Sequence, residues 1–319
     1  MRRYVILFAV LLLVVIVILV INQSRTGTEP EATPTTTSST AAETAVQHEE
    51  QGIALVEEHR YDEAIAEFDK AIDLNPELAM AYVHRGSAYN GKGEFDKAVA
   101  DLNKAIELDP ELAMAYVHRG SAYNGKGEFD KAIADLNKAI ELDPELAMAY
   151  ANKGNSNNGK GEFDKAVVDL NRAIELDPGL TIAYVSRGIA YLSEGVIDKA
   201  IADFSKAIEL NPELATAYGN RGYAYYVKGD FDQAIADLSK AIELDAEFAM
   251  AYNNRGIVYG IKGEYNEAIA DFDKAIELDP DLAIAYYNRA IADLEKCIEL
   301  SDDPELVESA GQLLDKVRD

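Results

Sequence analysis

The feature that most constrains this chain is a period of 34 residues. Residues 79–112 and 113–146 are consecutive blocks that differ at one position, where Val99 is replaced by Ile133. A fixed period of this length indicates a stack of identical supersecondary units, each packed on its neighbours, and not one globular core. The motif Tyr-x-x-Arg-Gly recurs in the same register, beginning at Tyr82, Tyr116, Tyr184, Tyr218 and Tyr252.

Each unit carries the pattern of two helices joined by a tight turn. Tyr82, Gly86 and Tyr89 are spaced four and three residues apart, as one packed face of a helix requires. The Gly-Lys-Gly at 91–93 supplies residues that tolerate positive φ at a helix end. The Asp-Pro at 109–110 ends the unit, because proline lacks a backbone donor and disfavours helical geometry in the residue before it. The predicted hairpin has helices over residues 79–90 and 95–108.

These residues resemble the tetratricopeptide repeat family, whose pattern places an aromatic residue, Leu-Gly, Tyr, Ala, Phe and Pro at set positions of 34 residues. In this chain those positions hold Tyr82, Gly86, Tyr89, Ala98, Leu102, Ala105 and Pro110. Repeats begin near Ala45, Ala79, Ala113, Ala147, Thr181, Ala215 and Ala249, and a shortened one begins at Ala283. The resemblance covers residues 45–300, as seven full repeats and one shortened repeat, and implies an all-α, right-handed superhelical solenoid.

One departure from the family pattern recurs, since arginine or lysine precedes the glycine where the family usually has leucine. An aspartate lies at a constant offset in the second helix of the same repeat, so we predict structural ion pairs. Breaking a semi-buried pair costs roughly 3–5 kcal/mol, whereas a solvated pair, the alternative, contributes about 0–1 kcal/mol. The predicted pairs are Arg85–Asp101, Arg119–Asp135, Lys153–Asp169, Arg187–Asp203, Arg221–Asp237, Arg255–Asp271 and, in the shortened repeat, Arg289–Asp293.

A long apolar segment precedes the repeats. Residues 4–21, YVILFAVLLLVVIVILVI, carry no charge, and as a helix they would span roughly 27 Å, close to the hydrocarbon thickness of a bilayer. A cleaved signal peptide is the alternative, but its apolar region is shorter and ends in small residues. We therefore predict an uncleaved single-pass transmembrane anchor, and the chain resembles membrane-anchored prokaryotic members of the family.

The basic residues predict the orientation of this anchor. Arg2 and Arg3 lie in residues 1–3, before the segment, and positive residues tend to stay in the cytoplasm, so the repeats are predicted to be extracytoplasmic. Residues 22–44 are rich in Thr, Ser and Pro and are predicted to form a disordered linker. Residues 301–319 carry a stripe of apolar residues and are predicted to be a helix that caps the last repeat.

Composition restricts the partners. The formal net charge is -27 and the pI is near 4.5, so nucleic acid and anionic surfaces would be repelled. A neutral or basic protein or peptide is the expected partner. The sequence has no HExxH and no Ser-His-Asp or Cys-His pattern. We therefore expect no catalytic residue, no metal site, no cofactor and no enzymatic activity.

The resemblance also implies a binding surface. In tetratricopeptide proteins the first helices of the repeats line a concave groove, and in repeats five to seven the corresponding positions are apolar or carry amides. Asparagines can bond the backbone of a peptide, while aliphatic and tyrosyl walls accept its side chains. The predicted partner-binding residues are Ile189, Leu192, Asn220, Tyr223, Tyr226, Asn253, Asn254, Ile257 and Ile261. The alternative is that Ile189, Leu192, Tyr223 and Ile257 only pack between adjacent first helices.

These features together predict a membrane-tethered scaffold for protein–protein interaction. Two other functions stay open from the sequence. Near-identical units could form a structural spacer or a self-associating assembly element. The chain could also be the regulatory subunit of an enzyme complex.

Overall fold

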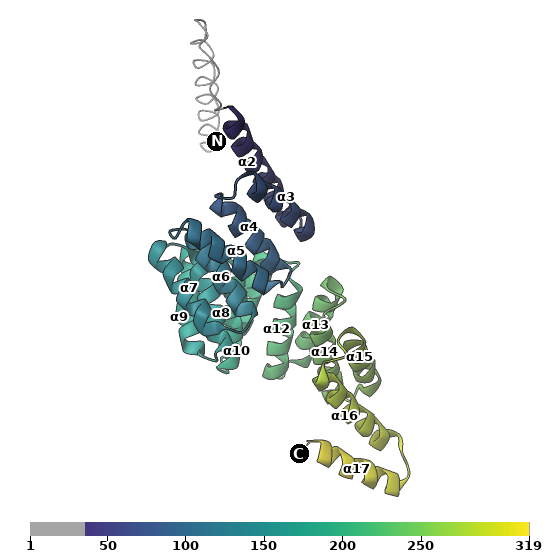
Figure 1. Ribbon diagram of the computed structural model, residues 1–319. Helices are drawn as coiled ribbons and strands as arrows, with labels where there is room; N and C mark the ends of the chain where they lie inside the picture. The colour runs from purple at the N-terminus through teal and green to yellow at the C-terminus, as the bar shows by residue number, and fades with distance from the viewer. Residues whose placement is uncertain (1–35, 319) are drawn as a thin grey trace, which may run out of the picture. The chain divides into compact units, whose positions relative to one another are not determined.

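A computed structural model of the chain describes residues 36–318. The chain divides into two units, residues 1–44 and 45–319, and the repeats occupy the second. Over the described residues all regular structure is helical, in sixteen helices without a strand (Figure 1). The helices are α2 (Thr36–Glu57), α3 (Tyr61–Leu74), α4 (Ala79–Gly91), α5 (Phe95–Leu108), α6 (Ala113–Gly125), α7 (Phe129–Leu142), α8 (Ala147–Gly159), α9 (Phe163–Leu176), α10 (Thr181–Ser193), α11 (Ile197–Leu210), α12 (Ala215–Lys228), α13 (Phe231–Leu244), α14 (Ala249–Ile261), α15 (Tyr265–Leu278), α16 (Ala283–Leu300) and α17 (Pro304–Arg318).

Each full repeat is a helical hairpin, as the sequence predicts. In the second repeat α4 ends where Gly93 adopts a φ of 74°, a conformation that only glycine takes at low cost. The Glu94 amide donates to the Tyr89 carbonyl at 2.9 Å and closes the turn. Asp109 follows α5, and its carboxylate accepts a hydrogen bond from the Glu111 amide at 3.0 Å, which turns the chain into the next repeat.

Small residues bring the helices of a repeat close together. Ala98, Leu102 and Ala105 of α5 are fully buried. A side chain at Gly86 of α4 would begin 2.8 Å from Leu102 Cγ, so only glycine fits there. Each second helix contacts the first helix of its own repeat and that of the next, so the repeats form a continuous all-helical solenoid (Figure 1).

Exposed ion pairs join the turns of successive repeats. A lysine at the end of one first helix reaches the aspartate at the start of the preceding second helix at five junctions, and the Nζ–Oδ1 distances lie between 2.5 and 2.9 Å. At the sixth junction Glu194 replaces the lysine. Desolvation and the neighbouring Asp164 carboxyl raise the pKa of Glu194. The five pairs are Lys92–Asp62, Lys126–Asp96, Lys160–Asp130, Lys228–Asp198 and Lys262–Asp232.

The shortened repeat forms the end of the array. α16 runs without a break through 18 residues, and α17 packs against it with Ala310 and Leu314 buried. The Asp303 carboxylate accepts a hydrogen bond from the Glu305 amide at 3.0 Å in the first turn of α17. α17 therefore covers part of the last first helix.

The linker prediction is wrong for its last residues, because α2 begins at Thr36. Ala41 and Ala42 are strong helix formers next to the first repeat, so the helix extends through them without a new nucleation step. Among residues 36–318 no helix is both long and apolar enough to cross a membrane. The predicted anchor, residues 4–21, lies outside the described part of the chain.

Candidate functional site

Buried arginine–aspartate pairs hold the two helices of repeats two, three, five, six and seven together. Arg119 donates from Nε and Nη2 to both carboxylate oxygens of Asp135, at 2.7 Å each, and Arg221 donates to Asp237 at 2.7 and 2.8 Å. The paired carboxylate raises the pKa of the Arg119 guanidinium. The aspartates are less than a tenth exposed. These ion pairs are therefore semi-buried, and the alternative of solvated pairs does not hold. The same two-pronged contact joins Arg85 to Asp101, Arg187 to Asp203 and Arg255 to Asp271.

The same arginines make a third contact that the sequence reasoning missed. Nη1 of Arg119 donates to Asn103 in the preceding repeat at 2.6 Å, and Nη1 of Arg221 donates to Ser205 at 3.1 Å. The acceptor lies 16 residues before the arginine and differs in type from repeat to repeat, so no single letter recurs to signal it. Each of these guanidiniums thus joins two second helices to one first helix.

In repeat four a lysine and an asparagine, in place of an arginine, bond the buried aspartate. Lys153 has one cationic nitrogen in place of the guanidinium fork and reaches Asp169 Oδ1 at 3.1 Å. The Asn157 amide donates to the other oxygen, Oδ2, at 2.8 Å. Asn157 stands where the other full repeats from the second onward carry tyrosine, so the two substitutions compensate each other.

The predicted pair in the shortened repeat is weak. Arg289 lies 3.4 Å from Asp293 but 2.6 Å from Asp273 of the preceding repeat. The continuous α16 places Asp293 one turn after Arg289 on the same helix, and not on a facing second helix. The main partner of Arg289 is therefore Asp273.

Asparagines join neighbouring first helices between repeats two and five. The residue at position twelve, counted from the start of each first helix, donates from its amide to a backbone carbonyl of the next first helix. We call these contacts the asparagine clasps. They join Asn90 to the carbonyl of His118 at 2.8 Å, Asn124 to that of Asn152 at 3.1 Å and Asn158 to that of Ser186 at 2.8 Å.

Position twelve changes in the later repeats, where it is Leu192, Tyr226 and Gly260. No described hydrogen bond from a side chain to a backbone carbonyl replaces the clasp there, although the Asn288 amide, which donates to Asn253 Oδ1 at 3.0 Å, joins α16 to α14. The helices α10, α12, α14 and α16 contact one another less closely than the earlier first helices do. The surface therefore opens between them.

A large hollow lies on this open surface between α12, α14 and α16. Its volume is about 440 Å³ and none of its lining residues is charged. Tyr223, Met250 and Ile284 are 38%, 42% and 44% exposed, which is unusual for apolar groups gathered in one place. The lining residues are Gly219, Asn220, Tyr223, Phe248, Met250, Ala251, Asn253, Asn254, Ile257 and Ile284.

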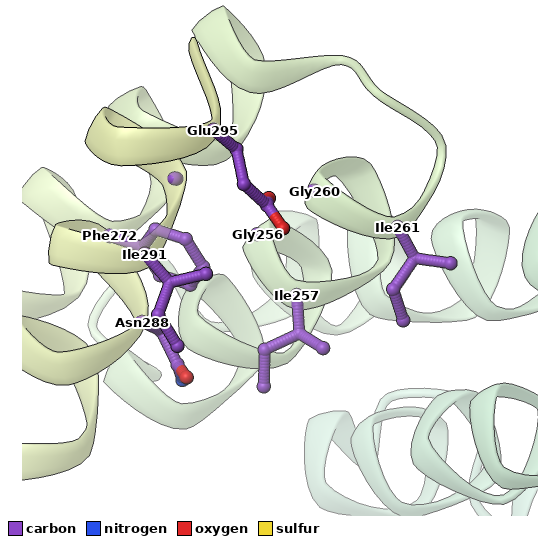
Figure 2. A pocket seen from close by; sticks show the side chains of 9 residues that line it. Gly256, Ile257, Gly260, Ile261, Phe272, Asn288, Ile291 and Glu295 are labelled. Atoms are coloured by element: carbon purple, nitrogen blue, oxygen red, sulfur yellow. The ribbon is translucent and has the colours of Figure 1, made fainter. Parts of the chain in front are cut away.

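A small hollow of about 190 Å³ adjoins it between α14 and α16 (Figure 2). Ile257 lines both hollows, and Asn288 of the small one donates to Asn253 of the large one at 3.0 Å. In Figure 2 the Glu295 side chain extends from α16 toward the backbone of α14 at Gly256 and Gly260. The lining residues are Gly256, Ile257, Gly260, Ile261, Phe272, Asn288, Ile291, Ala292 and Glu295.

Most of the predicted partner-binding residues meet at these hollows. Asn220, Tyr223, Asn253, Asn254 and Ile257 line the large one, and Ile257 and Ile261 line the small one. The hollows together thus contain six of the nine predicted residues.

The other predicted residues serve packing to different degrees. Leu192 and Tyr226 pack against the buried core, whereas Ile189 stays 37% exposed outside both hollows. Asn253 is only 1% exposed and bonded to Asn288, so its amide supports the surface and does not present a free group. Met250, Phe248 and Ile284 were missed, although Met250 occupies a groove position that repeats regularly in the sequence.

Comparisons with known proteins agree with this arrangement. Profiles of the tetratricopeptide repeat match residues 49–113, 113–146, 147–180, 215–248 and 249–282, and a TPR repeat profile matches residues 188–229. No curated protein sequence matches the chain.

Solved structures share the fold. The APC/C heterotetramer Cut9-Hcn1 superposes with a TM-score of 0.68 at 20% identity, over 84% of this chain and 55% of that one, so this chain spans about half its length. A tetratricopeptide repeat protein from Parabacteroides merdae gives a TM-score of 0.60 at 20% identity, over 78% and 99% of the two chains. Pseudomonas aeruginosa pilF gives 0.57 at 19% identity, over 67% and 98%. At these identities the likeness shows the fold alone.

Proposed function

Because this chain belongs to the tetratricopeptide repeat family, whose members generally mediate protein–protein interactions and scaffold complexes, we propose that it is a scaffold that binds a partner protein or peptide between α12, α14 and α16. Members of the family are typically not enzymes. The observation that carries the proposal is the uncharged large hollow of about 440 Å³. Hollows of this size with a few amides among apolar walls are typical of binding sites.

The contrast between the two halves of the array supports this location. In repeats two to four the asparagine clasps use the amides of position twelve for neighbouring backbone carbonyls. In repeats six and seven Asn220 and Asn254 line the large hollow beside apolar side chains. Amides and apolar walls together suit a segment that presents both its backbone and its side chains.

The charge of the chain supports a neutral or basic partner. This chain has a net charge of -27, so it would repel an acidic partner, and a basic partner would associate with it faster. We also propose that residues 4–21 anchor the protein in a membrane, with the repeats outside the cytoplasm, as in a membrane-anchored prokaryotic member of the family. The eighteen uncharged apolar residues and the preceding Arg2 and Arg3 support this part.

A charge placed in the large hollow tests the binding site. Met250 and Met148 occupy the same position of repeats seven and four and are 42% and 38% exposed. Proteins captured by the full chain should be lost from Met250→Glu, because the carboxylate lies in the uncharged hollow, and retained by the matched control Met148→Glu. Equal recovery by both variants would place binding elsewhere.

Three further measurements test the anchor, its orientation and self-association. Membrane fractionation of the full chain and of a variant lacking residues 4–21 tests the anchor, because only the deletion should be recovered in the soluble fraction. Protease added outside intact cells should cleave the repeats if they are extracytoplasmic. Light scattering tests the self-associating assembly element, which requires a mass above that of one chain.

A further inference from the structure

Gly260 lines the small hollow and leaves open the space that a side chain would take. It stands at position twelve of repeat seven, where the other full repeats from the second onward carry asparagine, leucine or tyrosine. A Cβ atom built on Gly260 meets no atom within 4 Å, whereas one built on Gly256 would lie 2.7 Å from the Phe272 ring. Gly256 is thus required by packing, but Gly260 leaves open space.

The small hollow has apolar walls with one amide, Asn288, and one charged residue, Glu295. Ile257, Ile261 and Ile291 form its walls, Ile261 is 52% exposed, and Glu295 is the single charged residue among those that line it. A carboxylate carries two oxygens with about four acceptor sites, so Glu295 can receive further donors on the surface. The hollow therefore combines space for an apolar side chain with a negative charge beside it.

The two hollows are positioned to bind one segment. Ile257 forms a wall of both, and the Asn288–Asn253 hydrogen bond joins one lining residue of each. A segment that places an apolar side chain in the large hollow therefore passes directly beside the small one.

We propose that the small hollow is a specificity subsite that accepts a second apolar side chain of the bound segment, with a lysine or arginine of that segment paired to Glu295. The inference rests on the proposed function and adds the chemistry of the partner: two apolar residues and one basic residue. The charge of the subsite matches the acidic character of the chain, which favours basic segments at long range.

Selection from a peptide library tests which side chains the bound segment must carry. The probe is a random library of twelve-residue peptides displayed on phage and selected on the immobilised full chain. The variants are Gly260→Leu, which fills the small hollow, and Glu295→Gln, which removes its charge. Gly311→Leu is the matched control, because Gly311 is a helical glycine of α17 that also has no atom within 4 Å of an added Cβ.

The wild-type chain should enrich peptides with two apolar residues and one basic residue. For a synthetic peptide of that sequence, Gly260→Leu should weaken binding about tenfold, as expected for losing one buried apolar side chain. Glu295→Gln should abolish the preference for lysine or arginine but keep both apolar residues. Gly311→Leu should bind as the wild type does.

The outcomes separate the two proposals. If Gly260→Leu selects and binds the same peptides as the wild type, the subsite is refuted while the groove stands. If the wild type enriches no peptide, or only peptides insensitive to Met250→Glu, the proposed groove fails and the subsite fails with it. Thermal unfolding checks the fold, and Gly260→Leu should melt no lower than the wild type, since leucine has the higher helix propensity.

Discussion

At the scale of the residue, polar side chains hold the repeats together. Only some of their contacts could be predicted from the sequence. The Arg119–Asp135 pair was predictable because both letters recur at a fixed offset. The third contact of Arg119, to Asn103, was not, because its acceptor changes among aspartate, asparagine and serine. The asparagine clasps were missed for a related reason. Their acceptors are backbone carbonyls, which every residue type carries, so no residue type in the sequence marks them.

Removing one buried carboxylate should be costly. We expect Asp135→Ala to lower the free energy of unfolding by about 3 kcal/mol, because it leaves the largely buried Arg119 guanidinium without its charge partner. Asp130→Ala is the control, since Asp130 also pairs with a cation but is 88% exposed, and it should change stability little. Urea denaturation measures both, and equal midpoints for the two variants would contradict the expectation.

A serine in repeat four completes one asparagine clasp. Ser156 donates from its hydroxyl to Asn124 Oδ1 at 2.7 Å, whereas Asn158 Oδ1 is buried without a hydrogen-bond partner, and Ala190 occupies the place equivalent to Ser156. We expect Ser156→Ala to destabilise the fold by about 1 kcal/mol and Ala190→Ser to stabilise it by a similar amount. Thermal melts of the two single variants test this, and shifts of the same sign would speak against it.

One histidine should make stability depend on pH. Burial, with a smaller effect of the nearby His84, lowers the pKa of His118 to about 4, against about 6.5 for an ordinary histidine. Between these values the unfolded chain binds a proton that the folded chain excludes, so stability falls as the pH drops from 6.5 to 4.

His118→Asn should remove this loss, and asparagine is suitable because Asn152 occupies the same position in the next repeat. Relative to its value at pH 7.5, the stability of the variant at pH 4 should fall by about 2 to 3 kcal/mol less than that of the wild type. Urea denaturation at the two pH values gives the difference, and parallel pH profiles would show that His118 is protonated equally in both states.

At the scale of the element, the helices could be predicted from the sequence. The spacing between neighbouring first helices could not. The spacing of Gly86 and Tyr89, the glycine turn and the proline predicted the hairpin of repeat two to within about a residue, because these depend on local geometry. How closely one first helix approaches the next depends on the side chain at position twelve, whose partner lies in another repeat. The hollows were therefore predicted only as a set of groove residues.

One junction of the stack should be improvable. Glu194 faces Asp164 where five other junctions pair lysine with aspartate. Because the raised pKa of Glu194 means that the folded chain retains its proton more readily, the contact favours folding at low pH and becomes repulsive as the pH rises.

Glu194→Lys should therefore raise the melting temperature at pH 7 by restoring the pair, and the gain should shrink as the pH falls toward 4. Glu194→Gln is the control that removes the repulsion without adding a pair, and it should give a smaller rise. Scanning calorimetry at several pH values measures this, and a lower melting temperature for Glu194→Lys at pH 7 would contradict it.

At the scale of the whole molecule, stability is the sum of repeats and of the contacts between neighbours. Residues 79–112 and 113–146 differ at one position, so deleting residues 113–146 joins repeat two to repeat four through a junction that the fold already contains. Asn90 then takes the place of Asn124, next to Asn152 and Ser156.

This deletion should fold and should leave the groove intact. We expect the denaturant m-value to fall by roughly an eighth, in proportion to the surface lost from the repeats, and the helical signal per residue to stay constant. Binding of a peptide selected on the wild-type chain should be unchanged, because the proposed groove lies in repeats six to eight. Loss of cooperative unfolding or of peptide binding would show that distant repeats are coupled.

The residue at position twelve changes the opening between neighbouring first helices without changing the buried pairs that hold the helices of a repeat together. An asparagine there joins neighbouring first helices, whereas a glycine leaves an opening, and neither residue takes part in the buried arginine–aspartate pairs. A substitution at this one position could therefore open or close a hollow while the arginine–aspartate pairs that fix the register of the stack stay as they are.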